Sequence, residues 1–406
     1  MTIATALVQS FCRYVAVSSQ SDGTQSCLPT TAGQLELAKL LQADLQQLGY
    51  HDSEITEHGI LIAKLPGNKA GAKTLGFVAH LDTVDVGLSA DIKPQLLRYE
   101  GAPLTLNHAL NITIDEQARP ELAQYKGQDI LFSDGTSVLG ADNKAAIAVM
   151  MTLAEQLKTN GESHGDIYFA FVPDEEVGLR GSKVMPLDKF PVTHCYTIDC
   201  CERGEVVYET FNAGQAVFTI QGVTAHPMSA KNVLVNPNLI ANDLINLVSD
   251  WGLPETTEQR EGYFWVIDIQ GNQTQAKVTV QIRDHNQHSY QARKAYLQQV
   301  LTMLQHKHPR ATIDLDLTDT YGNIAEAMGD DTSALDNLYQ ALAELNIPAK
   351  TIAMRGGTDG SALSVQGLFT PNFFTGAHNF HSAFEFLPVP SFVDSYQVAK
   401  RLVAMA

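Results

Sequence analysis

The chain has 406 residues, 44% of them hydrophobic, which is enough to bury a large core in more than one domain. Its net charge of −18 would repel phosphate backbones and anionic lipid, which argues against nucleic-acid and membrane-surface partners. No apolar stretch approaches the roughly 20 residues that span a bilayer. The N-terminal segment MTIATALVQSFCRYV lacks the basic region of a signal peptide and is typical of an amphipathic helix. Five sparse cysteines favour free thiols in a reducing compartment, so we expect a cytoplasmic protein.

The N-terminal half alternates helical and strand patterns. Residues 31–49 place Leu37, Leu41 and Leu45 on one helical face, and Gly49 is typical of a helix end. The elements that follow are a buried strand at 74–80 (TLGFVAH), a helix at 144–158, a buried strand at 166–173 and a strand at 194–199. Such alternation predicts an α/β sheet domain.

The pattern changes at about residue 212. The predicted elements are a strand at 216–223, a helix at 236–251, strands at 263–269 and 277–284, a helix at 289–307 and a strand at 312–317. This β-α-β-β-α-β order is that of a ferredoxin-like unit. An α/β pattern returns with a helix at 333–345, a strand at 350–354 and a last helix from about 391. The sequence therefore predicts a discontinuous α/β domain (1–211 and 326–406) with a ferredoxin-like domain (212–325) inserted into it.

The first candidate for a metal ligand follows the strand at 74–80. His80 and Asp82 stand at positions i and i+2, where side chains of an extended chain share a face. An imidazole beside a carboxylate is a common metal arrangement, because the carboxylate fixes the tautomer of the ligating histidine. The alternative is a surface histidine with a capping aspartate.

Acidic residues follow the next elements. Asp142 lies where the chain enters a helix, and its alternative role is a helix N-cap. Asp174, Glu175 and Glu176 close an apolar strand. Three adjacent acids repel one another unless a cation is near, although a solvated turn would also accommodate them.

Two further candidates complete the set. Asp199 ends a strand and has a turn residue as its alternative, and His381 lies among aromatics in HNFHSAFEF, where a packed histidine is the alternative. Together these positions give two histidines and three or four carboxylates, mostly at strand ends, where α/β sheets place their sites. Such a set suits two zinc ions that share a bridging carboxylate. Paired metal ions lower the pKa of a water molecule and polarise a carbonyl.

The motifs resemble those of a known family over essentially the whole chain. The order and spacing are similar to those of the peptidase T group of the M20 zinc metallopeptidases in seven segments: AHLDT, LGADNKAA, PDEEVG, YTID, HPMSAKN, MRGGTDGSALS and HNFHSAFEF. The resemblance implies a metallo-aminopeptidase that releases the N-terminal residue from short peptides, with tripeptides preferred. It also implies two Zn²⁺ per subunit, which Co²⁺ or Mn²⁺ can replace. We expect a homodimer joined through the inserted lid domain, because an edge strand of this unit can pair with a copy of itself across a two-fold axis.

The resemblance also implies a role for each site residue. The implied zinc ligands are His80, Asp142, Glu176, Asp199 and His381. Asp142 would bridge the two metals and precede a cis peptide bond. Glu175 would be the general base toward a zinc-activated water, and Asp82 would orient His80.

Three further residues are implied to act on the substrate. Arg283 and Arg355 match positions that hold the substrate, and a two-point contact with the C-terminal carboxylate would make the enzyme measure peptide length. His226, in HPMSAKN, matches the residue that reaches the scissile carbonyl, within its own chain or across a dimer. Its alternative role is an exposed loop histidine.

The chain departs from the family pattern at a few positions. Asn143 and Ala146 stand where Asp and Gly are frequent, Cys200 and Cys201 replace a glycine run, and Ala383 replaces a polar residue. The cysteine pair adjoins a zinc ligand, where it would reshape specificity, sense oxidation or reflect neutral drift. Two other functions stay open: a dipeptidase or deacylase of the same fold, and a non-catalytic metal-binding homologue. A peptide panel and metal analysis would separate them.

Overall fold

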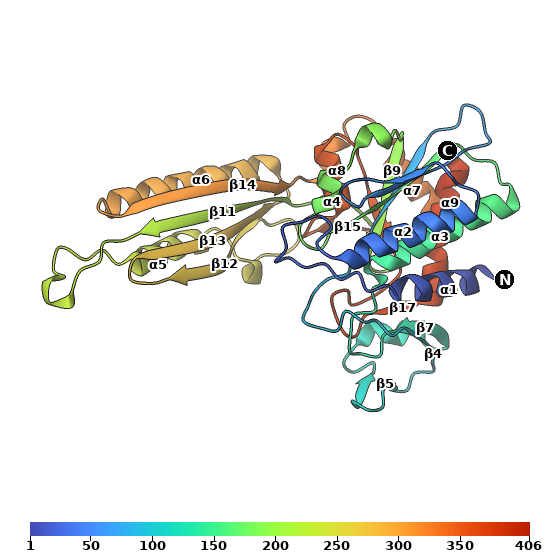
Figure 1. Cartoon of the computed structure of the whole chain (residues 1–406), viewed down its shortest axis with the longest axis horizontal. Helices are drawn as coiled ribbons and strands as arrows, with labels where there is room; N and C mark the ends of the chain where they lie inside the picture. Colours follow the sequence, from blue (N-terminus) through green and yellow to red (C-terminus); the bar gives the residue numbers. More distant parts are fainter. The chain divides into compact units, whose positions relative to one another are not determined.

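The computed structural model describes residues 1–406, which form two compact units (Figure 1). Unit 1 comprises residues 1–208, 327–352 and 358–406, and unit 2 comprises residues 209–326 and 353–357. The predicted insertion, 212–325, falls inside the long segment of unit 2, but the short segment was not part of it. The segment 353–357 belongs to unit 2 because its backbone carbonyls contact residues of that unit. The carbonyl of Met354 lies 3.0 Å from Nε2 of His285, and the carbonyl of Gly356 accepts a hydrogen bond from the amide of Phe211.

An eight-stranded sheet forms the centre of unit 1, in the order β1-β2-β8-β3-β9-β16-β10-β15. The strands are β1 (Ser53–Ile55), β2 (Leu61–Leu65), β3 (Leu75–His80), β8 (Ile167–Val172), β9 (His194–Cys200), β10 (Glu205–Thr210), β15 (Lys350–Met354) and β16 (Asn372–Phe374). Strand β3 pairs in parallel with β8 and β9. Every residue of β3 is buried, as expected for a strand that is covered on both faces.

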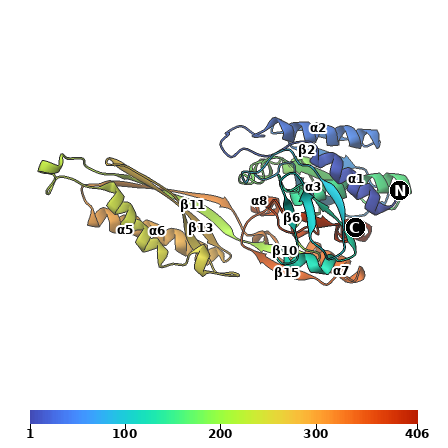
Figure 2. The same cartoon turned by 90° about the horizontal axis from the view of Figure 1, so that it is seen from below.

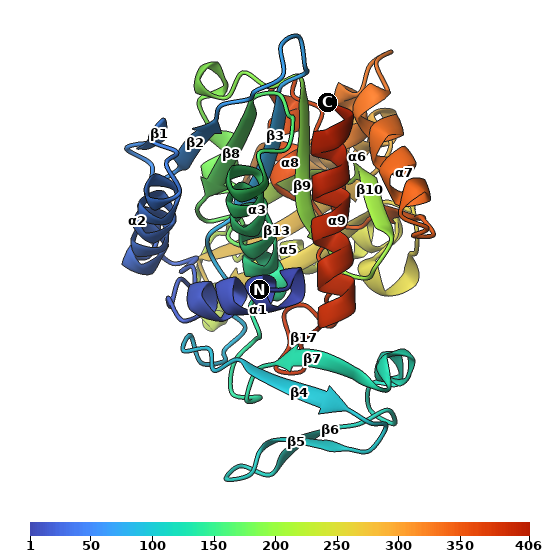
Figure 3. The same cartoon turned by 90° about the vertical axis from the view of Figure 1, so that its right-hand side faces the viewer.

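Helices cover both faces of this sheet (Figure 3). Helices α1, α3 and α9 pack against one another, and α3 also packs against β3 and β9, whereas α8 packs against β3 and β9 from the other side. The helices of unit 1 are α1 (Ile3–Val15), α2 (Ala32–Gln47), α3 (Ala141–Asn160), α4 (Arg180–Lys183), α7 (Ser333–Glu344), α8 (Asp359–Val365) and α9 (Val389–Met405), with the short 3-10 helix η2 (Leu187–Lys189). Helix α3 is buried along most of its length, because it lies between the sheet and its neighbouring helices.

A second, smaller sheet of unit 1 was not predicted from the sequence, which gave no element between residues 81 and 143. Its antiparallel order is β17-β7-β4. Its strands are β4 (Gln95–Tyr99), β7 (Gln128–Phe132) and β17 (Phe386–Pro388). Between β4 and β7 the chain forms a separate two-stranded hairpin, β5 (Leu104–Asn107) and β6 (Ile112–Ile114), and the 3-10 helix η1 (Pro120–Tyr125). A separate apolar cluster that includes Tyr99, Leu122, Ile130, Phe132 and Phe386 holds it together. Local sequence patterns missed this sheet because its strands are short and because β17 pairs with β7 from the opposite end of the chain.

Unit 2 contains the predicted β-α-β-β-α-β order: β11 (Asn212–Gln221), α5 (Pro237–Ser249), β12 (Tyr263–Gly271), β13 (Gln275–Asp284), α6 (Gln287–Lys307) and β14 (Thr312–Tyr321). Its 3-10 helices include η3 (Pro227–Ser229) and η4 (Pro254–Thr256), and η5 (Ile324–Ala327) follows β14. The antiparallel sheet has the order β12-β13-β11-β14, which is that of a ferredoxin-like fold. Helices α5 and α6 pack side by side on one face of the sheet (Figure 2). The predicted α/β architecture with its ferredoxin-like unit is confirmed.

Two general expectations from composition can be compared with the structure. No helix combines the length and apolar character needed to cross a bilayer. All five cysteines are free, and Cys195 and Cys200 are buried.

Candidate metal centre

Polar side chains gather at the carboxyl ends of the parallel strands of unit 1. His80 is the last residue of β3, Glu175 and Glu176 follow β8, and Asp199 lies near the end of β9. Because β3 pairs in parallel with both β8 and β9, these strand ends open at the same edge of the sheet. That edge is where ligands bind in α/β sheets.

Asp142 lies between two groups of these side chains. Its Oδ1 is 2.9 Å from Nε2 of His80, and its Oδ2 is 3.1 Å from Nε2 of His381. Nε2 of His381 is also 3.1 Å from Oε1 of Glu176, and Nε2 of His80 is 3.8 Å from Oδ1 of Asp199. One carboxylate therefore faces two groups, His80 with Asp199 and His381 with Glu176.

The donor set fits a pair of divalent metal ions. The candidate ligand atoms of His80, Asp142 and Asp199 lie within 4.8 Å of one another, as do those of Asp142, Glu176 and His381. The ion-pair partners of these carboxylates are histidines, not lysines or arginines. Imidazole nitrogens and carboxylate oxygens are ligands that zinc accepts, and a buried group of like charges is costly without a cation.

The approach of Asp142 to this position depends on an irregular turn. Gly140 has a φ of 75°, and Asp142 (φ −80°, ψ 98°) and Asn143 (φ −122°, ψ 20°) are not helical. The peptide bond between Asp142 and Asn143 is cis, as the resemblance implied. No side chain caps the start of α3, so the alternative role of Asp142 as an N-cap does not describe this structure.

Asp82 contacts the backbone of both glutamates and the imidazole of His80. Its two carboxylate oxygens accept the backbone N–H groups of Glu175 at 3.0 Å and Glu176 at 3.1 Å. Nδ1 of His80 is 3.0 Å from the backbone carbonyl of Asp82 and 3.4 Å from Oδ1 of the same residue. A proton on Nδ1 therefore faces Asp82 and leaves Nε2 available on the side of Asp142.

The three adjacent acids after β8 separate into different environments. Asp174 is fully buried, has a positive φ of 57°, and turns away from the two glutamates. Its carboxylate accepts from the amide and hydroxyl of Thr30 and from the side chain of Gln34. Neutral donors thus hold Asp174, which leaves Glu175 and Glu176 beside His80.

Burial and charge shift the acid–base equilibria of this cluster. Hydrogen bonds to Asp142 and Glu176 raise the pKa of His381 to about 11. Burial, with the charge of Asp142 adding to it, raises the pKa of Glu176 to about 6. The pKa of Glu175 lies well above its usual range, first because of burial and then because of Glu176 and Asp359. Since His381 must lose its proton to bind a metal ion, protons and metal compete here.

Three buried residues near the cluster were missed or undervalued at the level of sequence. Asn143 donates from Nδ2 to Oδ1 of Asp199 at 2.6 Å. Asp359 is 2% exposed, and burial raises its pKa to about 7. Glu385, which is 1% exposed, accepts three backbone N–H bonds from residues 139–142. For Asp359 and Glu385 the available signal was an acid within a Gly-rich or aromatic run, as in TDGSA and AFEFL.

The other three predicted residues lie in unit 2. His226 is exposed, and its Nδ1 accepts from the amide of Met228. Arg283 on β13 donates to the carbonyls of Gly214 and Ile282 and lies over the ring of Tyr321.

Arg355 lies between two aromatic rings and the loop before β12. Its guanidinium carbon is 5.2 Å from the ring centroids of both Phe211 and Tyr263. It donates to the carbonyls of Gln259 and Glu261 at 3.1 and 2.9 Å. Within unit 2 this arginine therefore fixes the loop that precedes β12.

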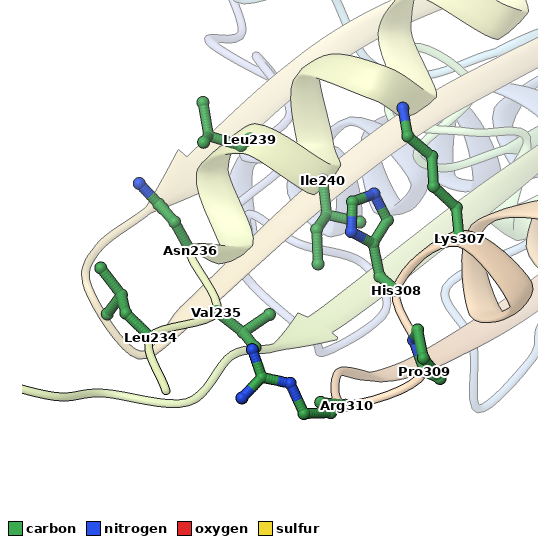
Figure 4. A pocket seen from close by; sticks show the side chains of 9 residues that line it. All are labelled: Leu234, Val235, Asn236, Leu239, Ile240, Lys307, His308, Pro309 and Arg310. Carbon is green, nitrogen blue, oxygen red and sulfur yellow. The ribbon is translucent and has the colours of Figure 1, made fainter. Parts of the chain in front are cut away.

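A pocket of ≈ 240 Å³ lies on unit 2 between the start of α5 and the end of α6 (Figure 4). Leu234, Leu239 and Ile240 line it together with the basic residues Lys307 and Arg310. Lys307 pairs with Asp243, and Arg310 donates to the backbone carbonyls of residues 232 and 233. None of the predicted site residues lines this pocket.

The chain is similar to characterised families over its full length. The model of peptidase family M20/M25/M40 matches residues 139–405. A peptidase T-like protein of Yersinia pestis is 54% identical over 100% of this chain and 99% of its own, and a peptidase T of Bacillus subtilis is 38% identical over 98% and 99%. The fold is similar to that of the aminopeptidase PepT from Bacillus cereus, with a TM-score of 0.78 at 21% identity over 98% of both chains. The chain therefore belongs to peptidase family M20/M25/M40, as its resemblance to the peptidase T group predicted, and is a peptidase hydrolase.

Proposed function

We propose that this protein is a two-zinc aminopeptidase that releases the N-terminal residue from short peptides, with tripeptides preferred. The observation that carries the proposal is the position of Asp142, whose two oxygens face His80 and His381 separately. The names peptidase T and aminopeptidase among the similar proteins support the reaction class. A cytoplasmic location, as the sparse free cysteines suggest, is part of the same proposal.

In this proposal five residues hold the metals: His80, Asp142, Glu176, Asp199 and His381. Zinc ions there would lower the pKa of a water molecule and polarise the scissile carbonyl. Asp82 keeps the Nδ1 proton of His80 directed away from the cluster, and Asn143 orients Asp199. Cobalt or manganese would serve the same ligands.

Glu175 is the proposed general base. Its amide is fixed by Asp82, and its carboxylate lies beside those of Glu176 and the imidazole of His80. Its raised pKa suits a group that takes a proton from the attacking water and later gives it to the leaving amine. Loss of either step would slow turnover without removing a metal ligand.

The proposed contacts with the substrate come from unit 2. Arg355 or Arg283 would bind the C-terminal carboxylate of the peptide, which charge-assisted bonds of a guanidinium favour. His226 would stabilise the oxyanion, within its own chain or from a partner. We also propose a homodimer joined through unit 2, which is a lid in this proposal, because β12 and β14 are both edge strands.

One assay tests the function. Purified protein is loaded with zinc, cobalt or manganese, its metal content is measured, and di-, tri- and tetrapeptides with free N-termini are compared. We expect two metal ions per chain and the highest kcat/KM on tripeptides. Preferential cleavage of dipeptides or of N-acyl amino acids would replace the proposal with a dipeptidase or deacylase, and metal binding without cleavage would replace it with a non-catalytic role.

A further inference from the structure

The small sheet of unit 1 connects two parts of the candidate metal centre. Strand β7 leads into residues 133–140 and then to Asp142, and residues 378–385, which include His381, lead into β17. The two strands pair in antiparallel register, with Phe132 opposite Phe386. The two ligand-bearing segments therefore leave the same end of one paired ribbon.

Glu385 is the residue at which these segments join. Its Oε2 accepts the N–H groups of Leu139 at 2.7 Å and Gly140 at 2.9 Å, and its Oε1 accepts the N–H of Asp142 at 3.1 Å. The amide of Glu385 in turn donates to the carbonyl of Ser382 in the His381 segment. One side chain thus satisfies three main-chain donors of the opposite segment.

This buried carboxylate is held by main-chain donors. It is 1% exposed, and the hydrogen bonds to its two oxygens come from three backbone amides. A buried carboxylate is costly unless hydrogen bonds satisfy it. Since both oxygens are acceptors here, an amide side chain would place its NH₂ group against a backbone N–H and lose at least one bond.

We propose that Glu385 is a positioning residue that holds Asp142 and His381 as one unit. It fixes the main chain that leads into Asp142, including Gly140 in its left-handed conformation, so that the two carboxylate oxygens of Asp142 face different histidines. The inference rests on the proposed two-metal site. It adds that the geometry of this site depends on a residue that binds neither metal nor substrate.

Three variants of the full-length protein test this role. Glu385→Gln keeps the size of the side chain and removes one acceptor, and Glu385→Asp keeps both acceptors on a shorter arm. Asp44→Asn is the matched control, because Asp44 is a buried carboxylate of unit 1 that binds Arg13 and Tyr14 on α1. All three substitutions perturb a buried acid, but only those at Glu385 alter the contact between the ligand segments.

The first measurement needs no metal. Amide hydrogen exchange of the metal-free protein is followed in peptides that cover residues 133–143 and 378–386. We expect exchange in both segments to rise together in Glu385→Gln, to rise less in Glu385→Asp, and to stay at the wild-type level in Asp44→Asn. Unchanged exchange in both Glu385 variants would overturn the proposal.

The second measurement concerns the site itself. Cobalt binding is followed by the visible absorption of the loaded protein, and Tm is recorded in parallel. Glu385→Gln should weaken cobalt binding about 10–100-fold and change the spectrum, as loss of outer-shell partners does, whereas Asp44→Asn should lower Tm with the wild-type spectrum. A Glu385→Gln protein with the wild-type spectrum and affinity would overturn the positioning role. If this variant does not fold, the same comparison in Glu385→Asp decides.

The wild-type protein distinguishes a failure of the proposed function from a failure of the role proposed for Glu385. A wild-type protein that does not bind cobalt would contradict the two-metal site, while the exchange experiment would still confirm or overturn the contact that Glu385 makes. A wild-type protein that binds metal and cleaves no peptide would contradict the activity and leave the comparison of variants intact.

Discussion

The cluster around Asp142 in unit 1 and the buried Asp284 of unit 2 differ in how their negative charge is balanced. In unit 2, Asp284 is 5% exposed and pairs with the guanidinium of Arg293 at 2.8 Å. In unit 1, Asp142, Glu176 and Asp199 are shielded from solvent and have only histidines as ion-pair partners. The charge of a buried acid beside an arginine is already balanced by the guanidinium. A group of acids around two imidazoles, in contrast, has an excess of negative charge that a cation would neutralise. Unit 1 also contains a buried acid with an arginine beside it, since Asp44 pairs with Arg13 at 2.6 Å. The uncompensated charge is therefore a feature of the cluster around Asp142 and not of unit 1 as a whole.

The substitution with the largest expected effect is Glu175→Ala. Glu175 lies in the acidic cluster of unit 1, and we assign to it proton transfer and not metal binding. We expect kcat to fall about 10²–10⁴-fold, since loss of a general base has that size, while both metal ions stay bound. Steady-state kinetics on a tripeptide and metal analysis of the same preparation check this. Turnover within a few-fold of wild type would show that another group accepts the proton.

Asp142→Ala tests the bridge. Because its two oxygens face both ligand groups, we expect metal content to fall at both sites together, with activity lost in proportion. Equilibrium dialysis against zinc, followed by elemental analysis, measures the stoichiometry. Two tightly held zinc ions in this variant would exclude Asp142 as the shared ligand.

Arg355→Met tests whether unit 2 contributes a charge to the site. Loss of a charge-assisted contact should cost about 1.5–3 kcal/mol, which is a fall of roughly 10–150-fold in kcat/KM for peptides with a free C-terminus. C-terminally amidated peptides should be affected much less. An equal loss on both substrates would show that Arg355 acts only through its bonds to the loop at 257–261, and Arg283→Met then provides the comparison.

The pH dependence of stability should also differ between the units in the metal-free protein. In unit 1 the folded-state pKa is raised to about 6 for Glu176 and about 7 for Asp359, first by burial. Stability from a raised pKa is full below the unfolded value and is lost as pH rises through the folded one. Unit 1 should therefore lose stability between about pH 4.5 and 7, although the lowered pKa values of His194 and His378 oppose part of this trend.

Unit 2 should not follow this trend. The pKa values of Asp243 and Asp319 are lowered, the first by hydrogen bonds from Lys307 and His308 and the second by its bonds to Lys294 and Tyr290 against the effect of burial. Stability from a lowered carboxylate pKa is already present above about pH 4. Hydrogen exchange of each unit across this pH range measures the difference, and zinc should flatten the profile of unit 1. A parallel decline in unit 2 would contradict the contrast.

The subtlest test concerns His226. If this histidine acts on the site of a partner subunit, mixing inactive His226→Ala and Glu175→Ala proteins should restore activity, because each mixed dimer then contains one intact site. The restored rate should be at most a fraction of wild type. No recovery after proven subunit exchange would assign His226 to its own chain, and a fully active monomer would exclude the trans arrangement.

Much of this molecule was predictable from the sequence because its signals are local. The buried strands before His80, Glu175 and Asp199 are continuous apolar runs, and the alternation in 263–284 identified the paired strands of unit 2. His80 and Asp199 stand at the ends of such strands and Glu176 follows one, whereas Asp142 and His381 were identified as candidate ligands through the motifs of the family resemblance. The family assignment followed from the same residues.

Other features were decided only by the tertiary structure. The small sheet depends on β17 pairing with β7 across the length of the chain, so no local period reveals it. The different environments of Asp174 and its two glutamate neighbours depend on Thr30 and Gln34, which are remote in sequence. The role of Glu385 depends on three backbone amides of another segment. Sequence patterns report which side chains prefer burial, whereas the partner that satisfies a buried polar group is fixed only when distant segments pack together.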